Sequence, residues 1–196
     1  MSFKGRAVGL ALAVLLMTTA PGMRAAAAAD VQWASEQAPA SLYDLQTWSL
    51  EGEPVDLGRY RGQVALVVNT ASKCGLTPQY EGLEALYRDL APRGFVVLGF
   101  PANDFKEQEP GTAAEIREFC TLKFDVTFPL FAKTTVKGEQ KSEIYGLLCA
   151  ELAEPTWNFT KYLVDKHGRV LVRFGPRTAP DDQALRDAIL QALAAE

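Results

Sequence analysis

The sequence contains few of the residues that usually bind metals. Its 196 residues include a single histidine, His167, and three cysteines, and no two cysteines are spaced as C-x-x-C. Zinc ribbons and zinc fingers need that spacing, so these classes are excluded. A copper chaperone would need a second cysteine or histidine near the first, and His167 is the only histidine. We therefore expect no metal and no organic cofactor.

Basic charge is not in excess either. Twenty Lys and Arg residues stand against 24 Asp and Glu residues, which gives a net charge of −4. Three of the positive charges, Lys4, Arg6 and Arg24, lie in the first 29 residues, so the rest of the chain is more acidic still. Nucleic acids and anionic membranes attract basic surfaces, and we expect neither as a partner.

The N-terminal apolar run is too short to span a bilayer stably, since spanning takes about 20 residues. It covers residues 7–17, follows Lys4 and Arg6, and precedes Ala27-Ala28-Ala29. This order is typical of a secretory signal peptide, although an uncleaved N-terminal anchor is the alternative. We expect a signal peptide at residues 1–29, a linker at 30–40, and a folded domain at 41–196 that is periplasmic or secreted, with no stable membrane insertion after cleavage.

One stretch organises the rest of the chain. Residues 64–71 form a mostly apolar run that is typical of a central strand covered on both faces. A polar turn with Cys74 follows, and the pattern then predicts a helix over residues 78–90, with Thr77 as its N-cap. A thiol at a helix N-terminus is stabilised as the thiolate by unpaired N–H groups and the helix dipole.

The order of the predicted elements indicates an α/β class with a thioredoxin-like fold. A β-α-β half is followed by a β-β-α half, with a mixed central sheet flanked by helices and an N-terminal β-hairpin. Cys74 lies where such folds carry a reactive cysteine, but Thr77 stands where a C-x-x-C motif would have its second cysteine. The remaining predicted elements are a hairpin within residues 41–60, strands at 95–100, 130–133, 158–165 and 170–174, and helices from Thr112 and at 142–150 and 181–194.

Four short motifs occur in order along the domain, and together they resemble the glutathione peroxidase family. They are Asn69-Thr70-Ala71-Ser72-Lys73-Cys74-Gly75, Phe100-Pro101-Ala102-Asn103-Asp104-Phe105, Gln108-Glu109-Pro110-Gly111 and Trp157-Asn158-Phe159-Thr160-Lys161. The resemblance implies a peroxidase in which Cys74 is the peroxidatic cysteine, a position that some relatives give to selenocysteine. It also implies that Gln108, Trp157 and Asn158 are active-site residues.

The chemistry of these residue types agrees with that reading. A Cys74 thiolate can attack the O–O bond of a peroxide and become a sulfenic acid. The amides of Gln108 and Asn158 and the indole N–H of Trp157 are donors that do not titrate, so they can polarise the peroxide without a histidine base. Lys73 adds positive charge nearby. We expect reduction of hydrogen peroxide and organic hydroperoxides, in protection against oxidative stress.

Cys120 matches the resolving position of thioredoxin-dependent members of the family. It would attack the sulfenic acid and form a Cys74–Cys120 disulfide. Cys120 shares the apolar face of its predicted helix with Ile116 and Phe119, so it is expected to start buried. Bridging needs Cα atoms within about 7 Å, and we therefore predict that this helix partly unwinds during turnover. The alternative is that Cys120 only fills the core.

The sequence departs from the family pattern at three places. Ala102 replaces a cysteine, Asp104 replaces a glutamine, and Lys106-Glu107 replaces a step that contains glycine. Asp104 adds a negative charge near the predicted site, where it could repel anionic substrates. The segment at residues 148–157 lacks the longer insertion of tetrameric members, so we expect a monomer.

The reductant is expected to be a thioredoxin-like protein or glutathione, with the resemblance favouring the former. Two other hypotheses stay open: an exported disulfide oxidoreductase, against which the missing C-x-x-C counts, and a redox sensor that passes its disulfide to a partner. Cys149 matches no family motif, and we interpret it as structural. His167 lies in a predicted turn with Lys166 and Gly168 and is expected to be solvated.

Overall fold

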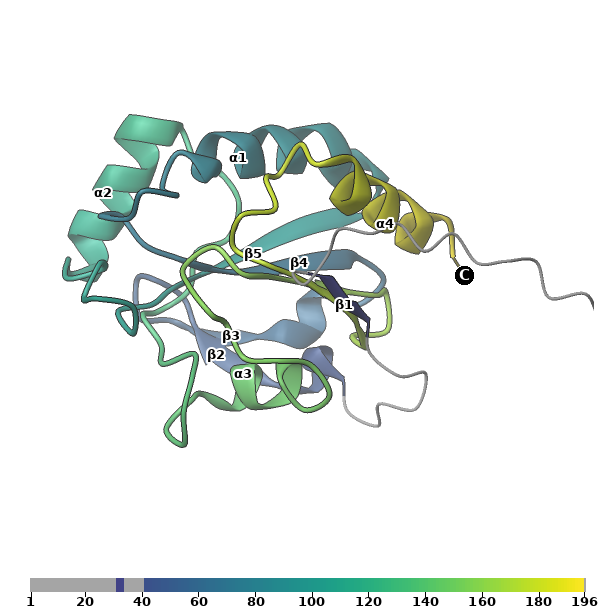
Figure 1. Ribbon diagram of the computed structural model, residues 1–196, viewed down its shortest axis with the longest axis horizontal. Coiled ribbons are helices and arrows are strands. Elements are labelled where there is room, and N and C mark those ends of the chain that lie inside the picture. The colour runs from purple at the N-terminus through teal and green to yellow at the C-terminus, as the bar shows by residue number, and fades with distance from the viewer. Residues whose placement is uncertain (1–30, 34–40, 196) are drawn as a thin grey trace, which may run out of the picture.

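A five-stranded mixed sheet forms the centre of the molecule, in the order β1-β7-β6-β4-β5 (Figure 1). The computed structural model describes residues 31–33 and 41–195. The predicted signal peptide and most of the predicted linker lie outside the described residues. The strands of the sheet are β1 (Val31–Trp33), β4 (Val64–Thr70), β5 (Phe95–Pro101), β6 (Lys161–Val164) and β7 (Val170–Phe174).

The first βαβ unit is confirmed. Every residue of β4 and β5 is buried, and the two strands pair in parallel with Val64 opposite Phe95. Continuous apolar strands of this kind are covered on both faces. Helix α1 (Gln79–Leu90) connects them, and Gly94 turns the chain into β5 with a φ of +87°, in the left-handed region that glycine adopts at little cost.

The second half of the sheet is antiparallel. Strand β6 pairs with both β4 and β7, as the predicted hairpin requires. Strand β1 pairs with β7 at the edge, with Val31 opposite Phe174. The prediction of a linker was therefore wrong for residues 31–33. A strand of three residues is too short to show an alternating pattern, although Val31 packs against the core.

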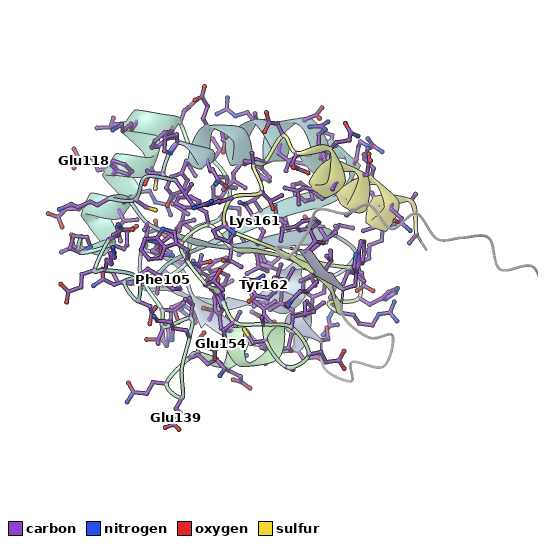
Figure 2. All side chains as sticks on the ribbon, viewed as in Figure 1. Phe105, Glu118, Glu139, Glu154, Lys161 and Tyr162 are labelled. Atoms are coloured by element: carbon purple, nitrogen blue, oxygen red, sulfur yellow. The ribbon has the colours of Figure 1, made fainter. Side chains whose placement is uncertain are left out.

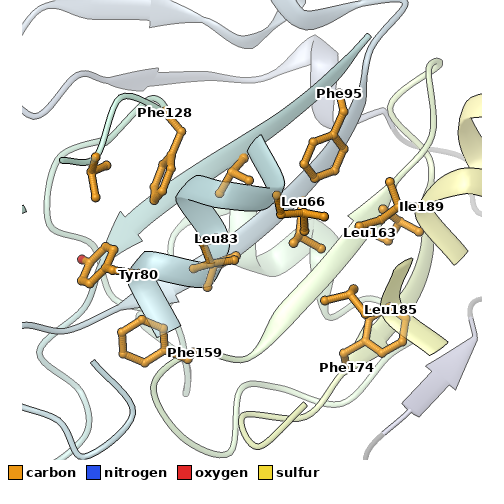
Figure 3. Packing of buried hydrophobic residues seen from close by; sticks show 14 of the residues in the cluster. Leu66, Tyr80, Leu83, Phe95, Phe128, Phe159, Leu163, Phe174, Leu185 and Ile189 are labelled. Atoms are coloured by element: carbon orange, nitrogen blue, oxygen red, sulfur yellow. The ribbon is translucent and has the colours of Figure 1, made fainter. Parts of the chain in front are cut away.

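Two layers cover the sheet (Figure 1). Helices α1 and α4 (Gln183–Ala194) lie on one face, where Leu83, Leu185 and Ile189 pack over Leu66 and Leu163 (Figure 3). The opposite face is covered by α3 (Glu143–Leu148) and by the predicted N-terminal hairpin, β2 (Gln46–Trp48) and β3 (Pro54–Asp56). Side chains alternate between the two faces along each strand, so each face has a core of its own.

Helix α2 (Ala113–Phe124) lies beside α1 and opens with the predicted capping box, in which Thr112 and Glu115 bond to each other's backbone N–H groups. The prediction of a strand at residues 130–133 was wrong. Leu130 makes only an isolated bridge to Gly99, and Phe131 makes one to Ser49. Among residues 41–195, three short 3-10 turns complete the elements: Leu42–Asp44, Leu57–Tyr60 and Ala91–Arg93. Within the described part of the chain, no helix combines the length and the apolarity needed to cross a membrane.

Candidate active site

Three strand ends meet at one edge of the sheet, and the predicted site residues follow or precede them. Because β4 and β5 are parallel, the segment with Cys74 and the segment with Gln108 leave the sheet at the same edge. Strand β6 runs antiparallel to β4, so the residues before it, Trp157 and Asn158, reach that edge as well. His167, in the turn between β6 and β7, is exposed as predicted and lies at the opposite edge.

The Cys74 thiol lies in a series of turns that precedes α1. The Cys74 N–H donates to Thr77 Oγ1 (3.0 Å), and the Thr77 hydroxyl donates to the Ala71 carbonyl (2.8 Å). The prediction of Thr77 as the helix N-cap was therefore wrong: α1 begins after Pro78 without a side-chain cap. Thr77 instead closes the loop around the cysteine. The Leu76 N–H donates to Cys74 Sγ at 3.4 Å, a contact that a thiolate strengthens.

Gln108 forms hydrogen bonds with the Cys74 loop through its backbone and with Asn158 through its side chain. Its carbonyl accepts a hydrogen bond from the N–H of Lys73, the residue directly before Cys74 (3.0 Å). Its side-chain Oε1 accepts from Asn158 Nδ2, also at 3.0 Å. The amide NH₂ of Gln108 is thereby left as a donor for another group. Asn158 is fully buried, and its Oδ1 makes no hydrogen bond within the described residues.

A tight turn positions Trp157 and Asn158. Asn69, at the end of β4, donates through Nδ2 to the Trp157 carbonyl (3.1 Å) and accepts through Oδ1 from the Thr160 N–H (3.1 Å). Phe159 has a φ of +66°, which ends the extended backbone. For this reason β6 begins at Lys161. The predicted start at Asn158 was wrong. Asn69 belongs to the first of the four motifs, but the motif alone does not indicate this positioning role.

Trp157 forms one side of an open cleft of about 470 Å³, which we call the Trp157 cleft. Its ring packs at 5.6 Å from the Phe105 ring, and Lys106 Nζ lies 5.7 Å from the indole centroid. Both contacts fix the plane of the indole. The cleft is lined by Gly75, Leu76, Trp157, Pro176 and Arg177.

The loop before Gln108 contains two of the departures from the family pattern, at Asp104 and at Lys106-Glu107. Lys106 and Glu107 have φ values of +54° and +52°, where glycine is the least strained residue. The Asp104 carboxylate accepts a hydrogen bond from the Val136 N–H (3.2 Å), so it holds the 134–136 segment. Asn103 Oδ1 accepts from the Glu109 N–H (2.8 Å) and closes the loop.

Glu109 is a buried carboxyl whose burial is not evident from its place in the third motif. Its Oε2 accepts a hydrogen bond from Ser72 Oγ at 3.1 Å, while Oε1 is buried without a hydrogen bond among the described residues. Burial raises the pKa of Glu109, and the bonds from Ser72 and the charges of Lys133 and Lys73 oppose that rise. The glutamate therefore joins the Cys74 loop to the loop that precedes α2.

Cys120 is fully buried on α2, as predicted. Burial raises the pKa of its thiol to about 11, so it is protonated in this conformation. An open pocket of about 340 Å³ is lined by Ser72 and Lys73 of the Cys74 loop, by residues 109–111, and by Glu115, Ile116 and Phe119 of α2. All three cysteines are free thiols, and Cys149 Sγ lies 3.5 Å from the Tyr162 hydroxyl.

The fold and the thiol at the end of β4 define a thioredoxin-like thiol protein that lacks a C-x-x-C pair. The part of the chain that the structure describes holds no group of His, Cys, Asp and Glu suited to a metal ion. The family model described as glutathione peroxidase matches residues 42–149, which include Cys74, Gln108 and Cys120.

Known proteins agree with that match. The hydroperoxy fatty acid reductase gpx1 of Synechocystis is 46% identical over 159 residues, which cover 76% of this chain and 94% of the relative. The thioredoxin/glutathione peroxidase BtuE of Escherichia coli is 42% identical over 74% of this chain and 93% of its own length. The crystal structure of T. cruzi GPX1 superposes with a TM-score of 0.60 at 32% identity, covering 80% of this chain and 98% of that one. The chain belongs to the glutathione peroxidase family, and it is a thiol peroxidase.

Proposed function

We propose that Cys74 is the peroxidatic cysteine and that it reduces hydrogen peroxide and organic hydroperoxides. The observation that carries this proposal is the contact network around the thiol, in which Lys73 bonds to Gln108 and Gln108 bonds to Asn158. This network holds amide groups beside the Cys74 loop and leaves the Gln108 NH₂ as a donor. Such preorganised donors stabilise charge that develops during a reaction.

The first step transfers one oxygen atom from the peroxide to sulfur. The Cys74 thiolate attacks the terminal peroxide oxygen, a new S–O bond forms and the O–O bond breaks. The alkoxide or hydroxide leaves and takes a proton, and Cys74 becomes a sulfenic acid. Donors from Gln108 and Trp157 stabilise the departing oxygen, and neither group changes its protonation state near neutral pH.

The second step uses Cys120 as the resolving cysteine. Its thiolate attacks the sulfur of the Cys74 sulfenic acid, so an S–S bond forms and the S–O bond breaks. The departing hydroxide takes a proton and becomes water. Because the Cys120 thiol is buried and protonated in this conformation, α2 must loosen first, which exposes the thiol and lowers its pKa.

A dithiol protein or glutathione then reduces the disulfide. The E. coli relative is named a thioredoxin/glutathione peroxidase, which supports a thioredoxin-type reductant. The Synechocystis relative is named a hydroperoxy fatty acid reductase, and the Trp157 cleft has the apolar side chains Leu76, Trp157 and Pro176 that an alkyl chain would contact. We therefore include lipid hydroperoxides among the proposed substrates, with protection against oxidative stress as the role.

Export and assembly complete the proposal. A cleaved signal at residues 1–29 would deliver the enzyme to the periplasm, where the reductant is a thioredoxin-like protein or a small thiol. The short segment between Leu148 and Trp157 supports a monomer. Mass spectrometry of the protein recovered from periplasm and cytoplasm would identify the N-terminus, and a full-length chain that stays with the membrane would contradict export as a cleaved protein.

A peroxide-consumption assay tests the proposal. With thioredoxin and thioredoxin reductase as the reducing system, wild type is expected to turn over, Cys74→Ser to lose activity, and Cys120→Ser to stop after one oxidation. Cys149→Ser is the matched control and should keep wild-type rates. Full activity of Cys74→Ser would refute the whole reading. Disulfide reduction without peroxide consumption would identify a disulfide oxidoreductase instead.

A further inference from the structure

A buried lysine lies next to the Trp157 cleft. Lys161, the first residue of β6, is fully buried. It projects from the sheet on the face that α1 and α4 cover, while Tyr162 projects on the other (Figure 2). Its Nζ donates to Gln79 Oε1 and to the backbone carbonyls of Pro176 (3.4 Å) and Thr178 (2.5 Å). Burial of an ammonium group is costly, and these oxygen atoms offset part of that cost.

Gln79 closes a triangle of hydrogen bonds with Lys161 and the Pro176 carbonyl. Its Oε1 accepts from Lys161, and its Nε2 donates to the Pro176 carbonyl at 2.8 Å. Gln79 is the first residue of α1. We call this group the Lys161 clamp; it consists of Gln79, Lys161, Pro176 and Thr178. The clamp therefore ties the start of α1 and the start of β6 to the segment that follows β7.

The three tied segments are those that line the Trp157 cleft. Gly75 and Leu76 precede α1, Trp157 precedes β6, and Pro176 and Arg177 belong to the segment after β7. The Lys161 side chain does not line the cleft, whereas Pro176 belongs both to the clamp and to the lining. The lysine's effect on a substrate must therefore pass through the residues that it holds.

The segment after β7 is also held at Pro180. A Cβ atom added at Gly82 of α1 would lie 3.0 Å from Cβ of Pro180 and 3.1 Å from its Cγ. The close approach of α1 to Pro180 thus depends on glycine at this position. The segment after β7 is held by the clamp at residues 176 and 178 and by this contact at Pro180.

We propose that Lys161 is a positioning residue that sets the preference of the peroxidase for bulky hydroperoxides. It holds residues 176–178 as the far wall of the Trp157 cleft, and that wall contacts the organic group of the substrate. Hydrogen peroxide has no organic group and does not need the wall. The inference rests on the proposed function, since it assumes that peroxides reach Cys74 through this cleft.

Lys161→Met tests the inference, because methionine keeps an unbranched apolar stem of similar length but cannot donate three hydrogen bonds. The readout is kcat/KM for cumene hydroperoxide divided by kcat/KM for hydrogen peroxide. We expect this ratio to fall about tenfold, because even a small displacement of a group that positions the substrate lowers the rate. The loss should appear mainly as a higher KM for cumene hydroperoxide, which is the signature of lost binding to a non-reacting part of the substrate.

Two further variants make the test decisive. Gly82→Ala moves the same segment through Pro180 without touching the clamp, so it should lower the ratio in the same direction, and it serves if Lys161→Met does not fold. Lys166→Met is the matched control, because its ammonium bonds to the Ala195 carbonyl at the far edge of the sheet. Its ratio should equal that of wild type.

The outcomes separate this inference from the proposed function. An unchanged ratio in folded Lys161→Met and Gly82→Ala would overturn the inference. If the ratio stayed the same because kcat/KM fell equally for both peroxides, the lysine would act at Cys74 itself. A wild-type protein that consumes neither peroxide would refute the proposed function. Circular dichroism and thermal unfolding of each variant report whether it is folded.

Discussion

Helices α1 and α2 have the same length, and each follows a loop that carries site residues, but they are packed very differently. Both have 12 residues. Helix α1 buries five of them, whereas α2 buries only two, Ile116 and Cys120. Leu122 of α2 is 78% exposed. Helix α1 can hold the Cys74 loop in place, and α2 has little packing to lose when it moves.

Both ends of α2 are held by local hydrogen bonds. The capping box of Thr112 and Glu115 closes its first turn. At its other end Arg88 of α1 donates to the Asp125 carbonyl (3.0 Å) and to the Asp125 carboxylate (2.8 Å). These are local bonds near the surface, where solvent screens charged groups, so each contributes little to stability. A helix held in this way can open without unfolding the domain, which our proposed resolving step requires.

The largest expected difference between the helices is in the cost of removing one buried side chain. Leu83→Ala in α1 leaves a cavity over the sheet and should lower the free energy of unfolding by about 3 kcal/mol. Ile116→Ala in α2 should cost about half as much, because α2 can shift to close the space. Urea denaturation of the two variants measures both values. Equal losses would contradict the weak packing of α2.

The second largest effect is expected from raising the pH, which should weaken the packing of α2. Burial raises the pKa of Cys120 from 9.0 to about 11, so its contribution to stability is complete below about pH 9 and is lost as the pH rises towards 11. Wild type should lose about 2 kcal/mol across this interval that Cys120→Ala does not lose. Denaturation curves at three pH values check this. Parallel losses in the two proteins would show that Cys120 is not held as a buried thiol.

Removal of the α2 cap should act on kinetics as well as on stability. Thr112→Ala should cost about 1 kcal/mol and speed formation of the Cys74–Cys120 disulfide about fivefold, because it favours the open helix. Stopped-flow tryptophan fluorescence after a peroxide pulse measures the rate. Ser142→Ala removes the cap of α3 and is the control: stability should fall similarly while the rate stays the same. Identical rates for all three proteins would argue against opening of α2.

The smallest effect concerns the loop that leads to Gln108. Glu107→Gly replaces a residue with a φ of +52° by the one that adopts it without strain, and should raise stability by about 0.5–1 kcal/mol. Lys106→Gly should gain less, since it also removes the contact with Trp157. Thermal unfolding compares the two. Destabilisation by Glu107→Gly would mean that the glutamate side chain supports the loop.

The comparison of the two helices also shows what the sequence could predict. Residues 64–68 are apolar without interruption, and Leu83, Leu86 and Leu90 repeat with a helical period, so the βα unit around Cys74 was predicted closely. The capping box of α2 was equally clear. What periodicity does not report is how heavily a helix is packed, and this separates α1 from α2.

Other parts of the site could not be predicted because the same residues serve several structures. Thr77 before Pro78 is typical of an N-cap, yet its hydroxyl closes the Cys74 turn. Charged residues are mostly exposed, so the burial of Glu109 and Lys161 depends on partners that only the folded chain brings close. The start of β6 was placed too early, because the turn at Phe159 has no glycine to reveal it.

The central claim is that Cys74 is oxidised by peroxide and that α2 then opens to deliver Cys120. The most direct measurement is peptide mass spectrometry under non-reducing conditions, after reduced protein has reacted with one equivalent of hydrogen peroxide. The account predicts a disulfide between the peptides of Cys74 and Cys120, with Cys149 still free. A lasting sulfenic acid on Cys74, or a disulfide to Cys149, would contradict it.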